Sequence, residues 1–87
     1  MLEVVDLVPP GRVTTYGAIA DVVGTGPRQV GAVMARDGGA VTWWRVVRAD
    51  GTLPAHLAAE ARARHRSEGT PLRPSGKVDL AAAFWEP

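Results

Sequence analysis

The sequence predicts a small, mainly α-helical domain of the winged-helix-like kind, in which a helix-turn-helix is accompanied by short strands. The chain has 87 residues, of which 46% are apolar, so it can bury one modest core. Two segments with the apolar spacing of helices lie on either side of a glycine-rich turn, and an alanine-rich segment follows later. We therefore expect a single domain over residues 1–87.

The first part of the chain predicts two short helices. Apolar residues among positions 2–8 alternate with Glu3 and Asp6 as on an amphipathic helix, and the following Pro-Pro-Gly ends it. A β-branched run at 13–15 indicates extended chain. Residues 18–23 then have the apolar spacing of one helix face, and the glycines at 24 and 26 stop this second helix.

A third helix is predicted to begin at Pro27 and to end at the glycine pair 38–39. Its apolar stripe consists of Val30, Val33 and Met34. The opposite side would carry cations and small residues, which suit a helix that enters a nucleic-acid groove, although many helical hairpins bind nothing. The residues of that outward side are Arg28, Gln29, Gly31, Ala32 and Arg36.

The second half predicts a strand, a long helix and a returning tail. Residues 45–51 have the pattern of a strand that runs into an Asp-Gly turn. The alanine-rich segment 54–68 is a strong helix former, with Gly69 as its C-terminal stop. The tail contains two prolines and a Ser-Gly turn before a short apolar segment, and we expect it to fold back on the core.

Charge and composition restrict the function. The net charge is +1, but residues 22–66 hold seven arginines against three acids, which suits a polyanionic partner or merely a solvated surface. The absence of cysteine excludes disulfides, thiolate metal sites and a thiol nucleophile. His56 and His65 lie more than two helical turns apart, so neither a metal nor another cofactor is expected. The N-terminus has the pattern of neither a signal peptide nor a membrane span, which predicts a soluble cytoplasmic protein without a membrane partner.

Three stretches, PPGRVTTYGAIADVVG, PRQVGAVMAR and WWRVV, together resemble a known family. In this order and spacing they are similar to the DNA-binding domain of the O6-alkylguanine-DNA alkyltransferases, and more closely to the alkyltransferase-like proteins. The resemblance extends over nearly the whole chain. It implies a helix-turn-helix DNA-binding domain, without the large N-terminal domain of the full alkyltransferases.

The resemblance also implies that the chemistry of the alkyltransferases is missing. Their Pro-Cys-His-Arg-Val segment aligns with residues 42–46, so Trp43 stands in place of the alkyl-accepting cysteine and Trp44 in place of its activating histidine. Counting back from Glu68 places the family's glutamate at Arg62. An indole has no nucleophilic atom comparable to a thiolate, so we expect a protein that is not an enzyme.

By resemblance, such a protein binds duplex DNA through the minor groove and rotates an O6-alkylguanine out of the base stack. Arg28 would enter the vacated space and Tyr16 would crowd the phosphate, although from pattern alone they would be a solvated residue and a core ring. Gly31 and Ala32 would allow close approach to the groove or would pack on the preceding helix. The expected DNA contacts are Thr14, Thr15, Tyr16, Arg28, Gln29, Gly31 and Ala32.

The lesion pocket is expected around Trp43, Trp44, Arg45 and Val46. Trp43 would form a wall of the pocket, with core packing as the alternative. Trp44, in an extended segment, would point away from Trp43 toward the core, and Arg45 would form a structural ion pair. Asp37 replaces the family's Asn and would bring an acid near DNA unless it pairs with Arg36, and the segment after Gly51 is short.

Two further interpretations remain open beside that of a damage sensor. The sensor hypothesis holds that a persistent noncovalent complex bends DNA and flags the lesion for nucleotide excision repair proteins, with the protein acting as a monomer. A second hypothesis is a helix-turn-helix DNA-binding protein without lesion specificity. A third is a DNA alkyltransferase with an unusual nucleophile.

Overall fold

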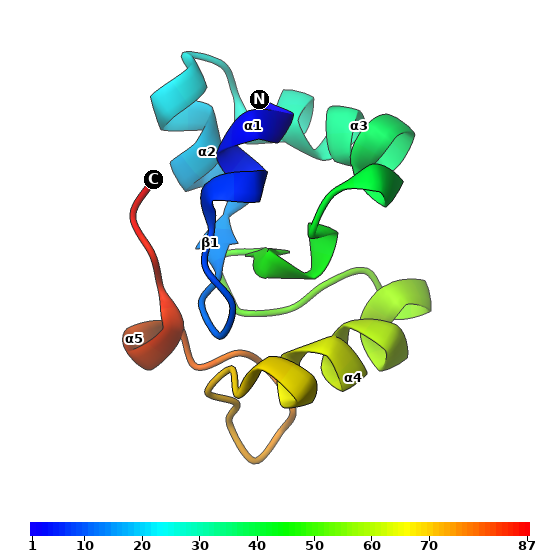
Figure 1. Cartoon of the computed structure of the whole chain (residues 1–87). Helices are drawn as coiled ribbons and strands as arrows, with labels where there is room; N and C mark the ends of the chain where they lie inside the picture. Colours follow the sequence, from blue (N-terminus) through cyan, green and yellow to red (C-terminus); the bar gives the residue numbers. More distant parts are fainter.

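The computed structural model describes residues 1–87, and it is mainly helical with two short strands, as the sequence predicts (Figure 1). The α-helices are α1 (Leu2–Leu7), α2 (Tyr16–Val23), α3 (Pro27–Asp37), α4 (Ala58–Glu68) and α5 (Leu80–Ala83). Three single-turn 3-10 helices are η1 (Gly38–Ala40), η2 (Trp43–Arg45) and η3 (Ala55–Leu57). The strands are β1 (Thr14–Thr15) and β2 (Val46–Val47).

Helices α2 and α3 form the predicted helix-turn-helix at the top of Figure 1. Helix α2 begins two residues earlier than the apolar spacing indicates, because the Thr15 hydroxyl accepts a hydrogen bond of 3.1 Å from the Ala18 N–H and caps the first turn. Gly24 ends α2 in the left-handed conformation, with φ of 83°. Pro27 occupies the first turn of α3, where its missing N–H costs nothing.

The two strands lie side by side and parallel, with Thr14 opposite Val46 and Thr15 opposite Val47. The C-terminal tail continues this arrangement, since Phe84 forms a parallel bridge with Val13. The tail therefore folds back on the core, as predicted. Strand β2 is shorter than its pattern indicates because the chain turns at once, with the Gly51 N–H donating to the Arg48 carbonyl at 2.8 Å.

The sheet separates two hydrophobic clusters. One cluster contains Val5 of α1, Ile19 and Ala20 of α2, Val30 of α3 and Val46 of β2. The other contains Val13, Val47, Val78 and Ala83, between the sheet and the tail. Adjacent Val46 and Val47 thus belong to different clusters, which follows from the alternation of side chains along a strand.

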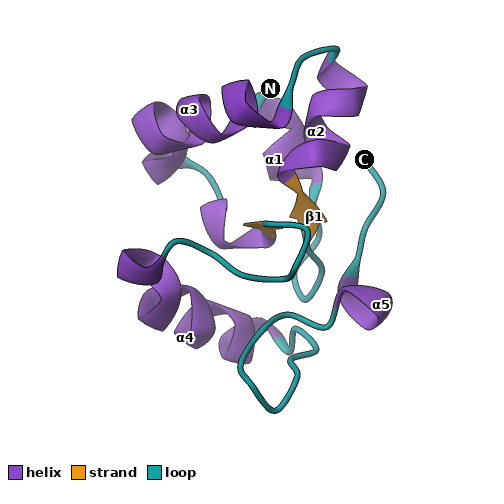
Figure 2. Ribbon diagram, turned by 180° about the vertical axis from the view of Figure 1, so that it is seen from behind, coloured by secondary structure: helices purple, strands orange, loops and turns teal.

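Helix α4 lies across the molecule from the helix-turn-helix, as the view from behind in Figure 2 also shows. It starts four residues later than the alanine-rich segment indicates, because η3 occupies residues 55–57, and it ends at Gly69 with φ of 75°. Leu7, which the sequence places on an apolar helix face, is 67% exposed. None of the helices has the length and hydropathy that crossing a membrane would require.

Candidate nucleic-acid interface

A cavity of about 320 Å³ opens beside Trp43, between the helix-turn-helix and the segment Leu53–Leu57. Tyr16 at the start of α2, Gly31 and Met34 of α3 and the indole of Trp43 form its walls. The cavity is within the size range of small-ligand sites. Its lining contains no lysine, arginine or carboxylate, and the titratable side chains in it are Tyr16 and His56. The cavity can therefore receive a flat, uncharged ring.

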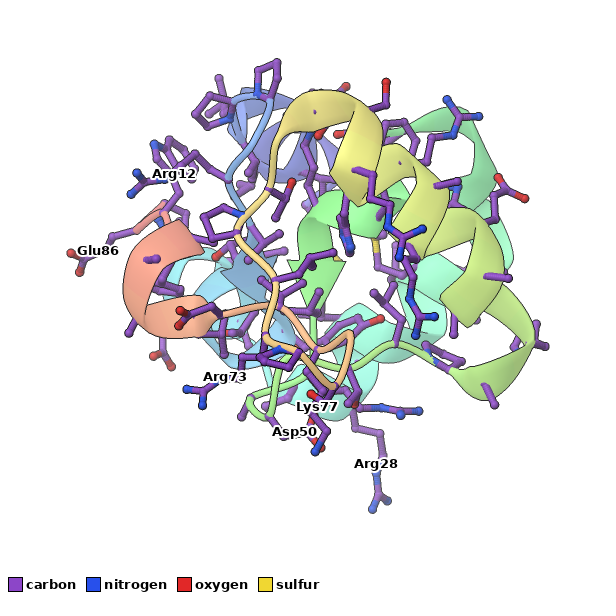
Figure 3. The ribbon with its side chains drawn as sticks, turned by 90° about the horizontal axis from the view of Figure 1, so that it is seen from below. Arg12, Arg28, Asp50, Arg73, Lys77 and Glu86 are labelled. Atoms are coloured by element: carbon purple, nitrogen blue, oxygen red, sulfur yellow. The ribbon has the colours of Figure 1, made fainter.

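The outward residues of α3 lie as the sequence predicts. Arg28, Gln29 and Ala32 are exposed, and Arg28 projects from the edge of the molecule in Figure 3. A Cβ built on Gly31 would meet no atom within 4 Å, so the small residue there does not serve close packing against α2. Its lack of a side chain instead leaves open space along the cavity.

Tyr16 is half-buried and lines this cavity. Burial raises the pKa of its hydroxyl, while the positive charge of Arg48 acts in the opposite direction, and the pKa remains above its ordinary value. The hydroxyl therefore stays protonated at neutral pH. It can donate a hydrogen bond to a phosphate oxygen.

The two threonines before Tyr16 have structural positions. Thr14 is 0% exposed, and its hydroxyl, which has no hydrogen-bond partner, lies inside the protein. The expected contact of Thr14 with phosphate is therefore wrong, because the side chain cannot reach the surface. Thr15 is the N-cap of α2, so its oxygen already accepts the Ala18 N–H.

Trp43 and Trp44 point to different surroundings. They lie in the turn η2 rather than in an extended segment, and their rings meet edge to face, with centroids 5.7 Å apart and planes at 88°. Trp43 lines the cavity, whereas Trp44 does not. The guanidinium of Arg64 on α4 lies 4.6 Å from the Trp44 ring centroid, and His65 Nε2 lies 2.6 Å from the Trp44 carbonyl oxygen.

Trp44 therefore packs against α4, and its placement in the lesion pocket is corrected. The reason is that η2 turns successive side chains apart and the charged face of α4 covers the second ring. Val46 is also removed from the pocket, because it is fully buried in the cluster between the helices.

Arg45 forms the predicted ion pair, and its partner is Glu68. The side chains are 12% and 14% exposed, and Arg45 also donates to the Val8 carbonyl at 2.9 Å. Arg45 thus does not line the cavity. Burial raises the pKa of Glu68, but hydrogen bonds from Arg45 and the Gly11 N–H, together with the positive charge of Arg45, outweigh it, so the pKa lies below its ordinary value. Glu68 is ionised at neutral pH.

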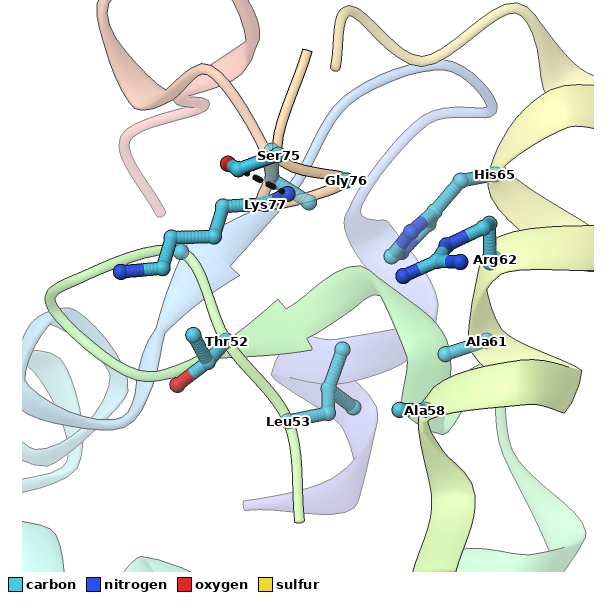
Figure 4. A pocket seen from close by; sticks show the side chains of 11 residues that line it. Thr52, Leu53, Ala58, Ala61, Arg62, His65, Ser75, Gly76 and Lys77 are labelled. Atoms are coloured by element: carbon cyan, nitrogen blue, oxygen red, sulfur yellow. Dashed lines mark hydrogen bonds between the residues drawn. The ribbon is translucent and has the colours of Figure 1, made fainter. Parts of the chain in front are cut away.

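The carboxylate beside the tryptophan pair is thus Glu68, and the alignment that puts Arg62 in its place is corrected. Arg62 lines a second cavity, of about 250 Å³, together with His65, Gly76 and Val78 (Figure 4). Leu53 lines both cavities, whereas Trp43 lines only the first and Arg62 only the second. Counting along the sequence misses this because the position of a helix residue depends on how α4 docks.

Two acidic residues near the expected interface have hydrogen-bond partners within the protein. Asp37 at the end of α3 accepts a hydrogen bond of 2.9 Å from Arg36, the pairing that the sequence makes possible. Asp50 accepts from the N–H and the hydroxyl of Thr52, at 3.1 and 2.6 Å. Neither carboxylate lines the cavity at Trp43.

Residues 1–70 match the family described as 6-O-methylguanine DNA methyltransferase, DNA binding domain. The chain belongs to this family. The DNA base-flipping protein of Escherichia coli is 36% identical over 89 residues, which cover 95% of this chain and 69% of that protein. The DNA base-flipping protein of Vibrio parahaemolyticus is 29% identical over 93 residues, which cover 100% of this chain and 93% of that protein.

Solved structures of the family share the fold. Atl1 of S. pombe, in complex with damaged DNA containing O6-carboxymethylguanine, superposes with a TM-score of 0.84 at 30% identity, over 99% of this chain and 91% of that chain. A second structure, of S. pombe ATL in complex with DNA, gives a TM-score of 0.80 at 31% identity, with the same coverage. The predicted resemblance to the alkyltransferase-like proteins is confirmed.

Proposed function

We propose that this protein binds duplex DNA and receives an extruded O6-alkylguanine in the cavity at Trp43 without accepting its alkyl group. One observation carries the proposal: an apolar cavity of about 320 Å³ is walled by an indole, in a chain that has no cysteine. The relatives named DNA base-flipping proteins and the Atl1 complex with O6-carboxymethylguanine DNA support it. The face of the Trp43 ring suits stacking with a base and apolar contact with an alkyl group.

Helix α3 would approach the minor groove with its outward side. Arg28, in the first turn, would occupy the space that the base leaves, where a planar guanidinium can stack and hydrogen-bond with the orphaned partner. Gln29 and Ala32 would border the groove, and Gly31 would keep the backbone close to it. Tyr16 would hold the phosphate of the rotated nucleotide through its protonated hydroxyl.

The consequence for the cell would be recognition rather than repair. A noncovalent complex removes no damage, so it acts only by persisting until another factor arrives. The partner class is the damage-recognition machinery of nucleotide excision repair, which responds to bent DNA. One flipped base requires no two-fold symmetry, so the protein would act as a monomer on intracellular DNA.

A binding titration tests the proposal with duplexes that differ by one O6-methylguanine. The wild type should bind the modified duplex at least about tenfold more tightly, and Arg28→Ala and Trp43→Ala should each lose most of this preference. Arg36→Ala is the matched control, because Arg36 is an exposed arginine of the same helix paired with Asp37. Equal affinity of the wild type for both duplexes would overturn the proposal in favour of a helix-turn-helix protein without lesion specificity.

Incubation with DNA labelled in the methyl group tests the absence of transfer. We expect all label to stay on the DNA, because the chain offers no thiolate to accept it. Label on the protein would instead indicate an alkyltransferase with an unusual nucleophile.

A further inference from the structure

Arg48 lies beside Tyr16 because of the register of the small sheet. Thr15 pairs with Val47 in the parallel strands β1 and β2. The residues that follow this pair, Tyr16 and Arg48, therefore leave the sheet at the same end. The positive charge of Arg48 is near enough to act on the Tyr16 hydroxyl. A candidate phosphate contact and an arginine are therefore neighbours, although 32 positions separate them in the sequence.

The side chain of Arg48 is exposed and free of carboxylate partners. The arginines that form ion pairs in the structure are Arg36, Arg45, Arg64 and Arg73, and Arg48 is not among them. Asp50 stands two positions further on, but its hydrogen bonds go to Thr52. The guanidinium is thus available to an external anion.

The backbone at Arg48 is held in place by a tight turn. Its N–H donates to the Thr52 carbonyl at 2.9 Å, and its carbonyl accepts from the Gly51 N–H at 2.8 Å. Gly51 has φ of 83°, and a Cβ there would come within 2.4 Å of the Val78 carbonyl oxygen, so the turn is packed against the tail. A fixed backbone lowers the entropy cost of placing the side chain on a ligand.

The turn faces the same side of the molecule as the start of α3. In Figure 3, Asp50 of the turn and Arg28 of α3 both project from the edge that is drawn lowest. A DNA strand bound along this side would meet both Arg28 and the turn that contains Arg48.

We propose that Arg48 binds a phosphodiester group of the DNA backbone next to the one that Tyr16 contacts, so that the ends of β1 and β2 form one phosphate-binding edge. This inference rests on the proposed function and extends it, because neither the family match nor the relatives assign a role to this residue. A guanidinium can donate two parallel hydrogen bonds to phosphate oxygens. Such a contact positions the duplex and is independent of the base that is flipped.

The test is the salt dependence of DNA affinity, measured for the wild type, Arg48→Ala and Arg48→Lys with modified and unmodified duplexes. Log affinity falls as log salt rises, and loss of one phosphate contact should make this negative slope shallower by about 0.9. At about 0.1 M salt, Arg48→Ala should weaken binding of both duplexes about five- to tenfold and leave their ratio unchanged. Arg48→Lys should retain the slope, because the charge remains.

Arg66→Ala is the control, since Arg66 is an exposed arginine without an ion pair and lies near the end of α4. The proposal is overturned if the slope for Arg48→Ala is unchanged or if Arg66→Ala makes the slope equally shallow. It is also overturned if Arg48→Ala changes only the ratio of the affinities for the two duplexes. A wild type that binds both duplexes equally contradicts the proposed function, whereas the slope of Arg48→Ala still decides the phosphate contact. Thermal unfolding of each variant verifies that the fold is intact.

Discussion

The two sides of the tryptophan pair differ in what fills them. On the Trp43 side an apolar cavity remains open, and no arginine, lysine or carboxylate lines it. On the Trp44 side the protein's own side chains fill the space: the Arg64 guanidinium lies over the ring, and Arg45 and Glu68 form a largely buried ion pair. Adjacent residues of one type can therefore have opposite roles. One ring packs against α4, whereas the other lines the cavity.

Arg45→Ala removes the ion pair on the Trp44 side and should have the greatest effect on stability. The change leaves the Glu68 carboxylate and the Val8 carbonyl without their partner in a poorly hydrated site. Removing one member of such a pair costs about 3 kcal/mol in the free energy of unfolding. Urea denaturation measures this loss. Arg36→Ala is the control, because its exposed pair with Asp37 should contribute less than about 0.5 kcal/mol; a similar loss in both variants would contradict the distinction.

The next largest effect compares the two rings directly. Trp43→Ala should weaken binding of the modified duplex by about 1–3 kcal/mol, the range measured for stacking of a base on an aromatic side chain, with little loss of stability. Trp44→Ala should instead lower the free energy of unfolding by about 2 kcal/mol, because the half-buried ring supports Arg45 and Arg64. Paired measurements of unfolding and DNA affinity check this; a reversed pattern would mean that the assignments of the rings are exchanged.

The pH dependence of stability should show the smallest effect. The pKa of Glu68 in the folded protein lies below its ordinary value of 4.5, so the ionised carboxylate adds stability that is fully present above pH 4.5. That contribution is lost as the pH falls through the lowered pKa. We expect the wild type to lose more stability than Glu68→Gln between pH 7 and pH 3, and the two unfolding curves to converge at the acid end. Parallel curves over the whole range would show that Glu68 does not contribute in this way.

Local signals in the sequence are sufficient for the elements of the helix-turn-helix. Gly24 and Pro27 mark the end of α2 and the start of α3, and these are backbone requirements that any context obeys. The outward position of Arg28 follows from the apolar stripe on the other side of α3. The return of the tail was also predictable, because its apolar end requires burial.

Features that depend on docking were not predictable in the same way. Which carboxylate meets Arg45 is set by the position of α4, 23 residues away, and counting along the sequence selected Arg62 wrongly. The strands have two residues each, so the alternation of side chains could not indicate on which face of the sheet Val46 lies. The sequence places Trp44 in the lesion pocket and at the same time turns its ring toward the core, because a single turn such as η2 has no periodicity that fixes where each ring points.

The perpendicular contact of Trp43 and Trp44 also gives the protein an intrinsic optical signal. Two indoles with centroids 5.7 Å apart couple electronically, and the coupling depends on their mutual orientation. A guest in the cavity would touch one of the two coupled chromophores and leave the other against α4. In a Trp85→Phe variant these two are the remaining indoles, so its fluorescence and circular dichroism would respond to a guest in the cavity.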